Sequence, residues 1–297
     1  MSKKQNQVVV KDNKIIEASY TLSLSEQRIL LACISQIDSK SSLLADHEFE
    51  IVASEIVDLM GVRPGNAYRD MKSAIEKLYS RSIKIDGEGS EMRWISSKDY
   101  VRDEGKVTLC FSQRIIPYLS QLTSKFTSYK LNYVTKFSSS YSIRLYEILV
   151  QWSSAGEREV SIEWLRDIFQ VTDKYKTIKD FKKYIIDPSI EDINTHSNLW
   201  VEYGQRKAGR VVTHLQFRFG VKYSQNDKKR LTEDEINKHA RPGESRPEVI
   251  ARLTGNSLSD FAKPGETLEQ ALKRKRGLAD MKKALKPGKP KASGIGA

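Results

Sequence analysis

The sequence predicts an α+β fold in which one domain-sized unit occurs twice. Each copy opens with an apolar helix that carries an arginine, Arg28–Leu31 in the first copy and Arg144–Glu147 in the second. A short helix and a longer helix follow, and strand-like sequence closes the copies at Lys106–Phe111 and Val211–Phe219. Self-similarity on this scale indicates a duplicated domain rather than the short repeats of a solenoid.

Within each copy, the order of elements is typical of a winged-helix domain. A short helix, a turn, a longer helix and a hairpin follow one another. In such domains the longer helix enters the DNA major groove, and the hairpin, or wing, can contact the backbone beside it. We therefore predict tandem winged-helix domains over 1–130 and 131–225, followed by a basic, partly disordered tail over 226–297.

The first copy begins with two recognisable helix signals. Ser23 and Glu26 have the spacing of a capping box ahead of an apolar run, which predicts a helix over about 25–37. A short helix is expected over 53–60, because Gly61 follows it at the position where a left-handed residue ends many helices.

The longer helix of the first copy is expected over 66–80, with Asn66 as its N-cap. Its apolar residues recur at helical spacing: Ala67, Met71, Ala74, Ile75 and Leu78. Strands are expected at 83–85, 92–95 and 107–111. The first hairpin among these strands carries Asp86, Glu88 and Glu91, which would make a poor clamp for phosphate.

The second copy follows a region expected to be a linking helix, 115–130. Its opening helix should cover 139–152, with inward-facing side chains that include Ile143, Tyr146 and Trp152. A short helix is expected over 162–169. The longer helix should begin near Ile178, where Thr177 is a suitable N-cap, and Pro188 should bend or break it. Two paired strands, 199–203 and 211–221, should flank a basic wing tip over 204–210.

The bulk composition indicates a polyanionic partner. The chain has 297 residues and a formal net charge of +12, which favours nucleic acid first and an anionic membrane surface second. No apolar stretch is long enough to span a membrane, and the N-terminus lacks the apolar core of a signal peptide. Cys33 and Cys110 stand among apolar residues, as expected of core side chains in a reducing compartment. A cytoplasmic protein fits these observations.

Basic residues of the second copy gather at the two places where a winged helix meets DNA. Lysines cluster around the start of the longer helix at Lys174, Lys176, Lys179, Lys182 and Lys183. The wing adds Arg206, Lys207 and Arg210. A helix N-terminus already attracts phosphate, and positions 179, 182, 183 and 186 are expected to share one face. Lysine mainly gives backbone attraction, with some base contacts expected from Lys179 and Lys183. The alternative is a solvated helix face and a solvated turn.

The corresponding surface of the first copy is less basic. Its candidate DNA-binding residues are Arg63, Asn66, Arg69 and Lys72. Arginine and asparagine are good readers of base edges. The alternative is that Asn66 only caps the helix and that Arg69 pairs with Asp70 or Glu76.

Residue patterns for catalysis are lacking. The sequence has no phosphate-binding loop of the Gly-x-x-x-x-Gly-Lys-Ser/Thr type, and its four histidines do not form metal-binding pairs. We therefore expect a protein that is not an enzyme and that uses no metal or other cofactor. A metal-dependent nicking enzyme of rolling-circle replication is the alternative that this pattern disfavours.

Four segments together resemble the iteron-binding plasmid replication initiators. They are 15–30, 111–119 with 126–131, 141–149 and 181–194, and the resemblance covers roughly residues 8–222. It implies a tandem winged-helix protein that binds directly repeated origin sites in double-stranded DNA, distorts the origin and helps to recruit host replication proteins, including the host initiator and the helicase.

The resemblance further implies that monomers bind the repeats, whereas dimers formed through the first domain repress the protein's own promoter at an operator. It also implies that the longer helix of the second domain is the stronger DNA reader. A transcriptional repressor with the same fold but without a replication role remains the alternative.

Overall fold

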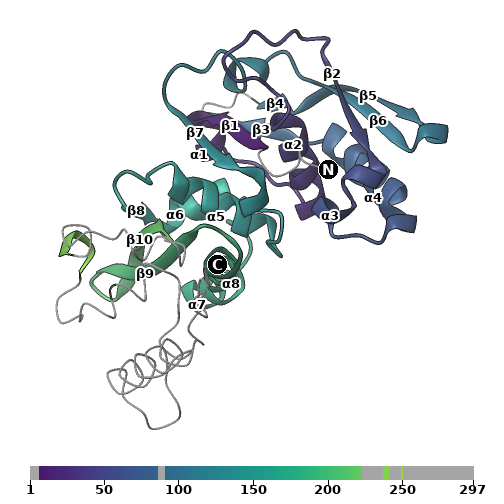
Figure 1. Cartoon of the computed structure of the whole chain (residues 1–297). Helices are drawn as coiled ribbons and strands as arrows, with labels where there is room; N and C mark the ends of the chain where they lie inside the picture. Colours follow the sequence, from purple (N-terminus) through teal and green to yellow (C-terminus); the bar gives the residue numbers. More distant parts are fainter. Residues whose placement is uncertain (1–6, 86–90, 223–236, 241–248, 250–297) are drawn as a thin grey trace, which may run out of the picture. The chain divides into compact units, whose positions relative to one another are not determined.

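The computed structural model describes residues 7–85, 91–222, 237–240 and 249 (Figure 1). The chain divides into two compact units, 1–221 and 222–297, and the fold given below is that of the first unit. The tail expected over 226–297 lies almost entirely outside the described residues.

The first domain folds around a three-stranded antiparallel sheet in the order β2-β6-β5. Apolar side chains from the sheet and from α2 and α4 form its core, including Phe49, Met71 and Phe111. The elements are α2 (Leu24–Ile34), β2 (Glu48–Val52), α3 (Val57–Met60), α4 (Ala67–Tyr79), β5 (Ile95–Val101) and β6 (Lys106–Phe111).

The second domain repeats this arrangement with a sheet in the order β8-β10-β9. In both domains the last strand is central, with the strand after the opening helix on one side and its hairpin partner on the other. The duplicated winged-helix domain predicted from the sequence is therefore confirmed. The elements are α5 (Ser140–Val150), β8 (Glu157–Ser161), α6 (Ile162–Ile168), α7 (Ile178–Phe181), a π-helical turn (Lys182–Ile186), α8 (Asp187–His196), β9 (Leu199–Ala208) and β10 (Val211–Val221).

Several local features predicted for the first domain are confirmed. Ser23 and Glu26 form the reciprocal capping box at the start of α2. Gly61 ends α3 in the left-handed region at φ 65°, and all five residues of the predicted apolar stripe on α4 are buried. Asn66 occupies the N-cap position of α4 as predicted, but its side chain makes no capping hydrogen bond. A 3-10 turn (Pro64–Asn66) leads directly into the helix.

The hairpin that carries Asp86, Glu88 and Glu91 is not the wing of the first domain. β3 (Ser82–Lys84) and β4 (Glu91–Arg93) form a separate two-stranded hairpin between α4 and β5 in the chain. Asp86 and Glu88 lie outside the described residues. The strands that correspond to β9 and β10 are β5 and β6, so the wing turns at 102–105.

The expected linking helix over 115–130 is wrong. This region contains a 3-10 turn (Ile116–Tyr118) and the strand β7 (Phe126–Lys130). β7 alternates exposed and buried side chains, a period of two that fits a strand with one covered face. It pairs antiparallel with β1 (Val8–Asp12), from Val8 opposite Lys130 to Asp12 opposite Phe126. β1 leads through α1 (Asn13–Glu17) into the first domain, and β7 leads through a 3-10 turn (Leu131–Tyr133) into the second.

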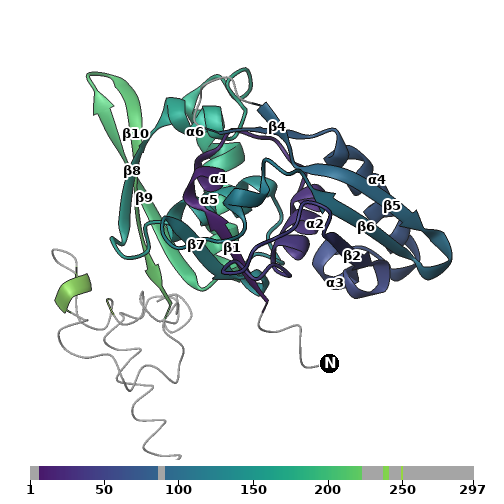
Figure 2. The same cartoon turned by 90° about the horizontal axis from the view of Figure 1, so that it is seen from above.

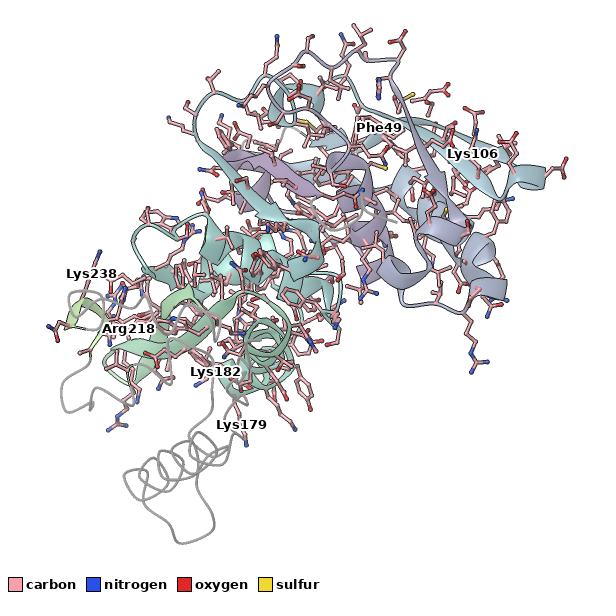
Figure 3. The ribbon with its side chains drawn as sticks, in the orientation of Figure 1. Phe49, Lys106, Lys179, Lys182, Arg218 and Lys238 are labelled. Atoms are coloured by element: carbon pink, nitrogen blue, oxygen red, sulfur yellow. The ribbon has the colours of Figure 1, made fainter. Side chains whose placement is uncertain are left out.

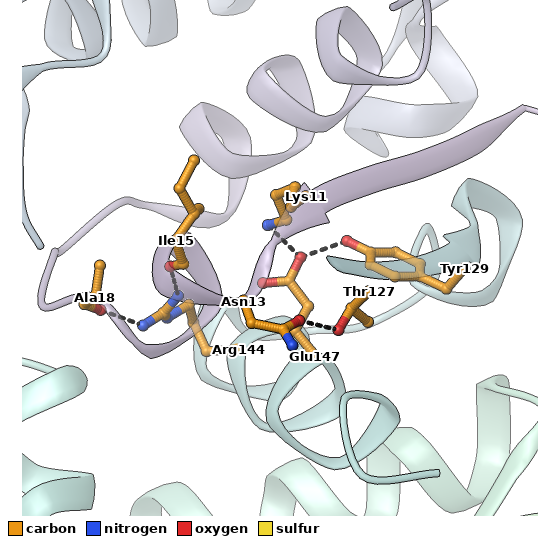
Figure 4. A network of polar contacts seen from close by, with 8 residues as sticks. All are labelled: Lys11, Asn13, Ile15, Ala18, Thr127, Tyr129, Arg144 and Glu147. Carbon is orange, nitrogen blue, oxygen red and sulfur yellow. Dashed lines mark hydrogen bonds and ion pairs between the residues drawn. The ribbon is translucent and has the colours of Figure 1, made fainter. Parts of the chain in front are cut away.

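Two buried arginines connect the domains reciprocally. Arg28 on α2 donates from Nη2 to the carbonyl oxygens of Thr135 and Phe137, at 2.8 and 2.9 Å, just ahead of the second domain's opening helix. Arg144 on α5 donates to the carbonyl oxygen of Ala18 at 2.6 Å, just ahead of the first domain's opening helix (Figure 4). Each opening helix therefore satisfies carbonyl groups in the segment that leads into the other domain.

A buried ion pair lies beneath the β1–β7 pair. Lys11 on β1 contacts the Glu147 carboxylate on α5, and the Tyr129 hydroxyl on β7 donates to the same oxygen (Figure 4). Burial, followed by the charge of Glu147, raises the pKa of Tyr129 well above its usual value, so the hydroxyl keeps its proton. The network joins one element from each lead-in segment to the second domain's opening helix.

One side chain predicted to face the interior of the second domain is exposed instead. Ile143 and Tyr146 are buried as expected, but Trp152 is 45% exposed. Trp152 lies beyond the last helical residue of α5, where the helical period no longer holds. Its ring instead packs against the guanidinium of Arg158, whose carbon lies 5.4 Å from the ring centre. Cys33 and Cys110 are both buried and free, as expected.

Candidate nucleic-acid interface

The recognition helix of the second domain runs from Ile178 to His196 as α7, a π-helical turn and α8. Thr177 caps it as predicted, because its Oγ1 accepts a hydrogen bond from the Asp180 amide at 3.0 Å. Pro188 does not end the helix, and the irregularity that accompanies it is a π-helical turn. It lies in the first turn of α8, directly after the π turn. A wider turn there accommodates a residue that lacks an amide hydrogen and would crowd the carbonyl four positions earlier.

The π turn also corrects one assignment of helix faces. Position 186 was expected to share the basic face, but Ile186 is fully buried, as are Phe181 and Ile185. A π turn inserts an extra residue, so the side chains after it are rotated relative to a regular α-helix. The basic face therefore consists of positions before Tyr184.

The lysines around the helix start face solvent. Lys174, Lys176, Lys179 and Lys183 are exposed, and none of them forms an ion pair with a carboxylate within the described residues. Figure 3 shows Lys179 projecting away from the ribbon of α7. Free ammonium groups at the positive end of a helix dipole create a local site for phosphate.

Lys182 has a different role from its neighbours. Its ammonium lies 3.3 Å from Oε1 of Gln205 on β9 and 5.2 Å from the centre of the Tyr203 ring. Tyr203 in turn donates from its hydroxyl to Asp187 at 2.5 Å. Burial and this hydrogen bond raise the pKa of Tyr203. These contacts fix the wing strand β9 against the recognition helix, so both surfaces are presented together.

The wing of the second domain is a long hairpin that projects from the domain (Figure 2). Its strands pair as far as Ala208 opposite Val211, leaving Gly209 and Arg210 as the turn. Gly209 has φ 60°, which suits glycine at the first position of a two-residue hairpin turn. Lys207 and Arg210 are exposed near this tip, without an ion pair among the described residues.

Arg206, a wing residue predicted to bind DNA, already forms an ion pair within the protein. Its Nη2 lies 2.9 Å from Oε1 of Glu159 on β8. A hydrogen bond from Gln216 and this ion pair lower the pKa of Glu159, so the carboxylate stays charged at neutral pH. Arg206 is half exposed and already has a counterion, and so it differs from Lys207 and Arg210.

The turn between α6 and the recognition helix is held by Arg166, which sequence reasoning did not single out. Its guanidinium donates to the carbonyl oxygens of four consecutive residues, Lys174 to Thr177, at 2.7 to 3.4 Å. It also lies 4.7 Å from the centre of the Phe181 ring. The available signal was an arginine in the last turn of a short helix, which is a common place for one. Arg166 therefore fixes the segment that carries Lys174 and Lys176.

In the first domain, the corresponding cations are mostly engaged within the protein. Arg63 is exposed and Asn66 is half-buried beside it at the start of α4. Arg69 pairs with Asp70 at 3.1 Å, the alternative that the sequence left open, and the Lys72 ammonium lies 4.8 Å from the centre of the Tyr100 ring. No exposed basic cluster like that at the start of α7 is present on the described part of α4.

Glu76 on α4 further neutralises this surface. It contacts Lys98 and accepts a hydrogen bond from the Tyr100 hydroxyl at 2.8 Å, both on the wing strand β5. The hydrogen bonds from Lys98 and Tyr100 lower the pKa of Glu76. The carboxylate is therefore ionised at neutral pH and faces the same side as Lys72 and Lys98.

Two family models match this chain in the order of its two domains. The model described as Initiator Replication protein, WH1, matches residues 8–150, and the model described as Initiator Rep protein, WH2, matches residues 161–219. The chain belongs to the initiator replication protein family. The resemblance to replication initiators that the sequence predicted is thereby confirmed.

Relatives of this initiator support the same assignment. A replication initiation protein of Escherichia coli is 26% identical over 221 residues, which cover 71% of this chain and 68% of the relative. The PI protein of Escherichia coli is 24% identical over 250 residues, 70% of this chain and 81% of that protein. A solved structure of Pi initiator protein in complex with iteron DNA matches with a TM-score of 0.65 and 24% identity, covering 74% of the initiator and 99% of that chain.

Metal-binding clusters and membrane-spanning helices are both absent from the described residues of this initiator. They contain no group of three or more histidine, cysteine, aspartate or glutamate side chains arranged to hold a metal ion. Among these same residues, no helix is both long enough and apolar enough to cross a membrane.

Proposed function

We propose that this initiator binds directly repeated sites, or iterons, in double-stranded DNA at a plasmid origin, and that its second domain is the main reader. The observation that carries the proposal is the set of exposed lysines at the start of the recognition helix, beside a basic wing, which form no ion pair with the carboxylates that the structure describes. Lys179 and Lys183 face the groove, Lys174 and Lys176 approach phosphates, and Lys207 and Arg210 contact the backbone or the adjacent minor groove.

The first domain contributes fewer contacts in this proposal. Arg63, Asn66, Arg69 and Lys72 stand at the corresponding helix start and approach a second stretch of the same repeat. Arg69 must exchange Asp70 for DNA to do so, which reduces the gain from each contact. The relative whose structure contains iteron DNA has the same fold over most of this chain, and that likeness supports binding by both domains.

Initiation follows from occupation of several adjacent repeats. Bending each repeat concentrates strain in neighbouring DNA, and AT-rich segments with flexible steps open at the lowest cost. The exposed strand then becomes available to host replication proteins, including the host initiator and the helicase. We further propose that dimers formed through the first domain bind an operator at the initiator's own promoter and repress it.

The decisive test is a binding titration with duplexes from upstream and downstream of the gene and with a scrambled duplex, each at several salt concentrations. We expect tight binding only to duplexes with direct repeats. Lys179→Ala combined with Lys183→Ala should weaken that binding about 30-fold or more, and should reduce its salt dependence, because two cations leave the DNA-facing surface. Equal, steeply salt-dependent binding to all duplexes would overturn the proposal.

The matched control is Arg69→Ala combined with Lys72→Ala, which removes the same number of charges from the first domain. It should weaken binding only about three-fold to five-fold, since Arg69 already has a counterion. A loss as large as that of the second-domain variant would show that the two domains read DNA equally. Circular dichroism melts of both variants test whether loss of folding, rather than loss of a contact, causes any weakening.

Two further measurements separate initiation from repression alone. Permanganate footprinting of the intact origin with host proteins should show reactive thymines beside the occupied repeats. The gene with its flanking repeats should also sustain a plasmid that lacks any other origin. Occupied repeats with neither result would identify the chain as a repressor without a replication role.

A further inference from the structure

Tyr184 is an exposed aromatic residue in the middle of the recognition helix. It lies in the π-helical turn and leaves 52% of its surface open to solvent. The residues around it are differently placed: Ile185 and Ile186 are buried, and Lys182 is turned to the wing. The core of the domain is therefore closed without the Tyr184 ring, and packing alone does not account for an aromatic side chain here.

The ring of Tyr184 is held in place by residues of the preceding turn. Its centre lies 5.6 Å from that of Tyr175, with an angle of 31° between the planes. Tyr175 has φ 51°, in the left-handed region, and its carbonyl accepts a hydrogen bond from Arg166 at 2.7 Å. The Lys183 ammonium lies 5.0 Å from the centre of the Tyr184 ring. An aromatic side chain fixed in this way loses little conformational entropy when it binds.

The chemistry of the major groove identifies a target for such a ring. Phosphates and guanine edges attract the neighbouring lysines, but these side chains do not distinguish A·T pairs by their apolar surface. The apolar group that a base pair presents in the major groove is the C5 methyl of thymine. A ring beside it removes both apolar surfaces from water.

We propose that Tyr184, braced by Tyr175, determines part of the site specificity by packing against the C5 methyl of a thymine. This rests on the proposed function, because it requires the recognition helix of the second domain to enter the major groove. In this proposal Tyr184 lets the helix recognise A·T pairs, which the lysine cluster by itself does not do.

The test uses the full chain and a duplex selected by that chain from a randomised library. Each thymine of the duplex is replaced in turn by deoxyuridine, which deletes the methyl group and leaves the base-pairing edges unchanged. For the wild type, we expect replacement at one or two neighbouring thymines to weaken binding about four-fold, which corresponds to about 0.8 kcal/mol for one buried methyl group.

Two variants of Tyr184 decide whether the ring is responsible. Tyr184→Ala should bind the thymine and deoxyuridine duplexes equally at that position. Tyr184→Phe keeps the ring and should retain the four-fold penalty, which also shows that the hydroxyl group is not the reader. Tyr79→Ala, which removes an exposed tyrosine from the end of α4 in the first domain, should retain the wild-type penalty.

Several results would overturn the inference while leaving the proposed function intact. These are a wild type insensitive to deoxyuridine at every thymine, a penalty undiminished in Tyr184→Ala, or a penalty lost in Tyr184→Phe or in Tyr79→Ala. Failure of the proposed function would look different, because the library would then yield no duplex that the wild type prefers to a scrambled one.

Discussion

In the second domain, Lys179 and Lys183 face solvent, and no carboxylate of the described residues pairs with them, whereas in the first domain Arg69 is paired with Asp70 and Lys98 with Glu76. The recognition helices of the two domains, α4 and the helix that begins with α7, hold equivalent positions beside sheets of the same topology. The difference shows that a duplicated scaffold leaves the charge pattern of each recognition helix free to change. An unpaired lysine exchanges only water and counterions for a phosphate, while a paired arginine must also give up its partner.

The two domains also differ in how the turn before the recognition helix is held. Aligning Leu59–Val62 with Ile168–Val171 places Val57 opposite Arg166. Arg166 donates to four turn carbonyls, and valine has no group that could do so. The second domain therefore has a preorganised turn as well as free charge, and both features favour it as the main reader.

The largest effect on stability should come from the buried arginine that each opening helix carries, Arg28 in the first domain and Arg144 in the second. Arg28→Met and Arg144→Met each leave buried carbonyl groups without their donors, so each should lower the free energy of unfolding by about 3 kcal/mol. Urea denaturation measures both, with exposed Arg63→Met as the control. A large loss for one arginine and none for the other would show that the two connections are not equivalent.

Arg166→Met tests whether a fixed turn before the recognition helix of the second domain contributes to its DNA affinity. Methionine fills a similar volume but cannot donate to the carbonyls of 174–177, so the turn becomes mobile. Affinity for a repeat duplex should fall about ten-fold, while the salt dependence stays unchanged because the lysines remain. Arg166→Lys tests charge against geometry. Full affinity in that variant would mean that the planar, multiple-donor guanidinium is not needed.

A smaller effect concerns the left-handed residue that ends the short helix in each domain. Gly61 has φ 65° and Gln170 has φ 53°. Gly61→Ala should destabilise by about 1 kcal/mol, because the space for a Cβ exists and only the backbone conformation is unfavourable. Gln170→Gly relieves that strain but loses the side-chain hydrogen bond to the Asp167 carbonyl, so urea midpoints should show little net change. A larger effect at Gln170 than at Gly61 would contradict this account.

The smallest effect tests whether the pairing of cations with Glu76 weakens DNA binding by the first domain. Glu76→Gln removes the carboxylate beside Lys98 and Lys72, and should raise affinity for a scrambled duplex about two-fold to three-fold at low salt. The pKa of Glu76 is lowered, so protonation should mimic this change only in acid, below the usual range of a glutamate. Unchanged affinity in titrations of Glu76→Gln would show that Glu76 does not restrain DNA binding.

Several features that depend on a local rule were predicted correctly from the sequence. The capping box at Ser23, the glycine stop at Gly61 and the threonine cap at Thr177 depend on neighbours within a few residues, and all three predictions are confirmed. The order of helices and strands in both copies follows from the same kind of rule. The family resemblance rested on longer segments and is also confirmed.

The remaining features depend on contacts distant in sequence or on one extra residue in a helix. β7 became a strand because β1, at the other end of the domain, pairs with it. Ile186 left the predicted basic face because the π turn shifts the helix register. Glu159 took Arg206 as a partner across the sheet. Arg166 and Tyr184 carried no sequence pattern that separated them from ordinary surface residues. The assignment of DNA contacts to individual residues stays a prediction.

The reciprocal arginines have a consequence for how such a protein can change over generations. Arg28 completes the segment that leads into the second domain, and Arg144 completes the one that leads into the first. A recombination event that exchanged one domain alone would bring in an opening helix unmatched to the old lead-in segment. We therefore expect the two domains to be exchanged together, as a pair whose opening helices already match their lead-in segments.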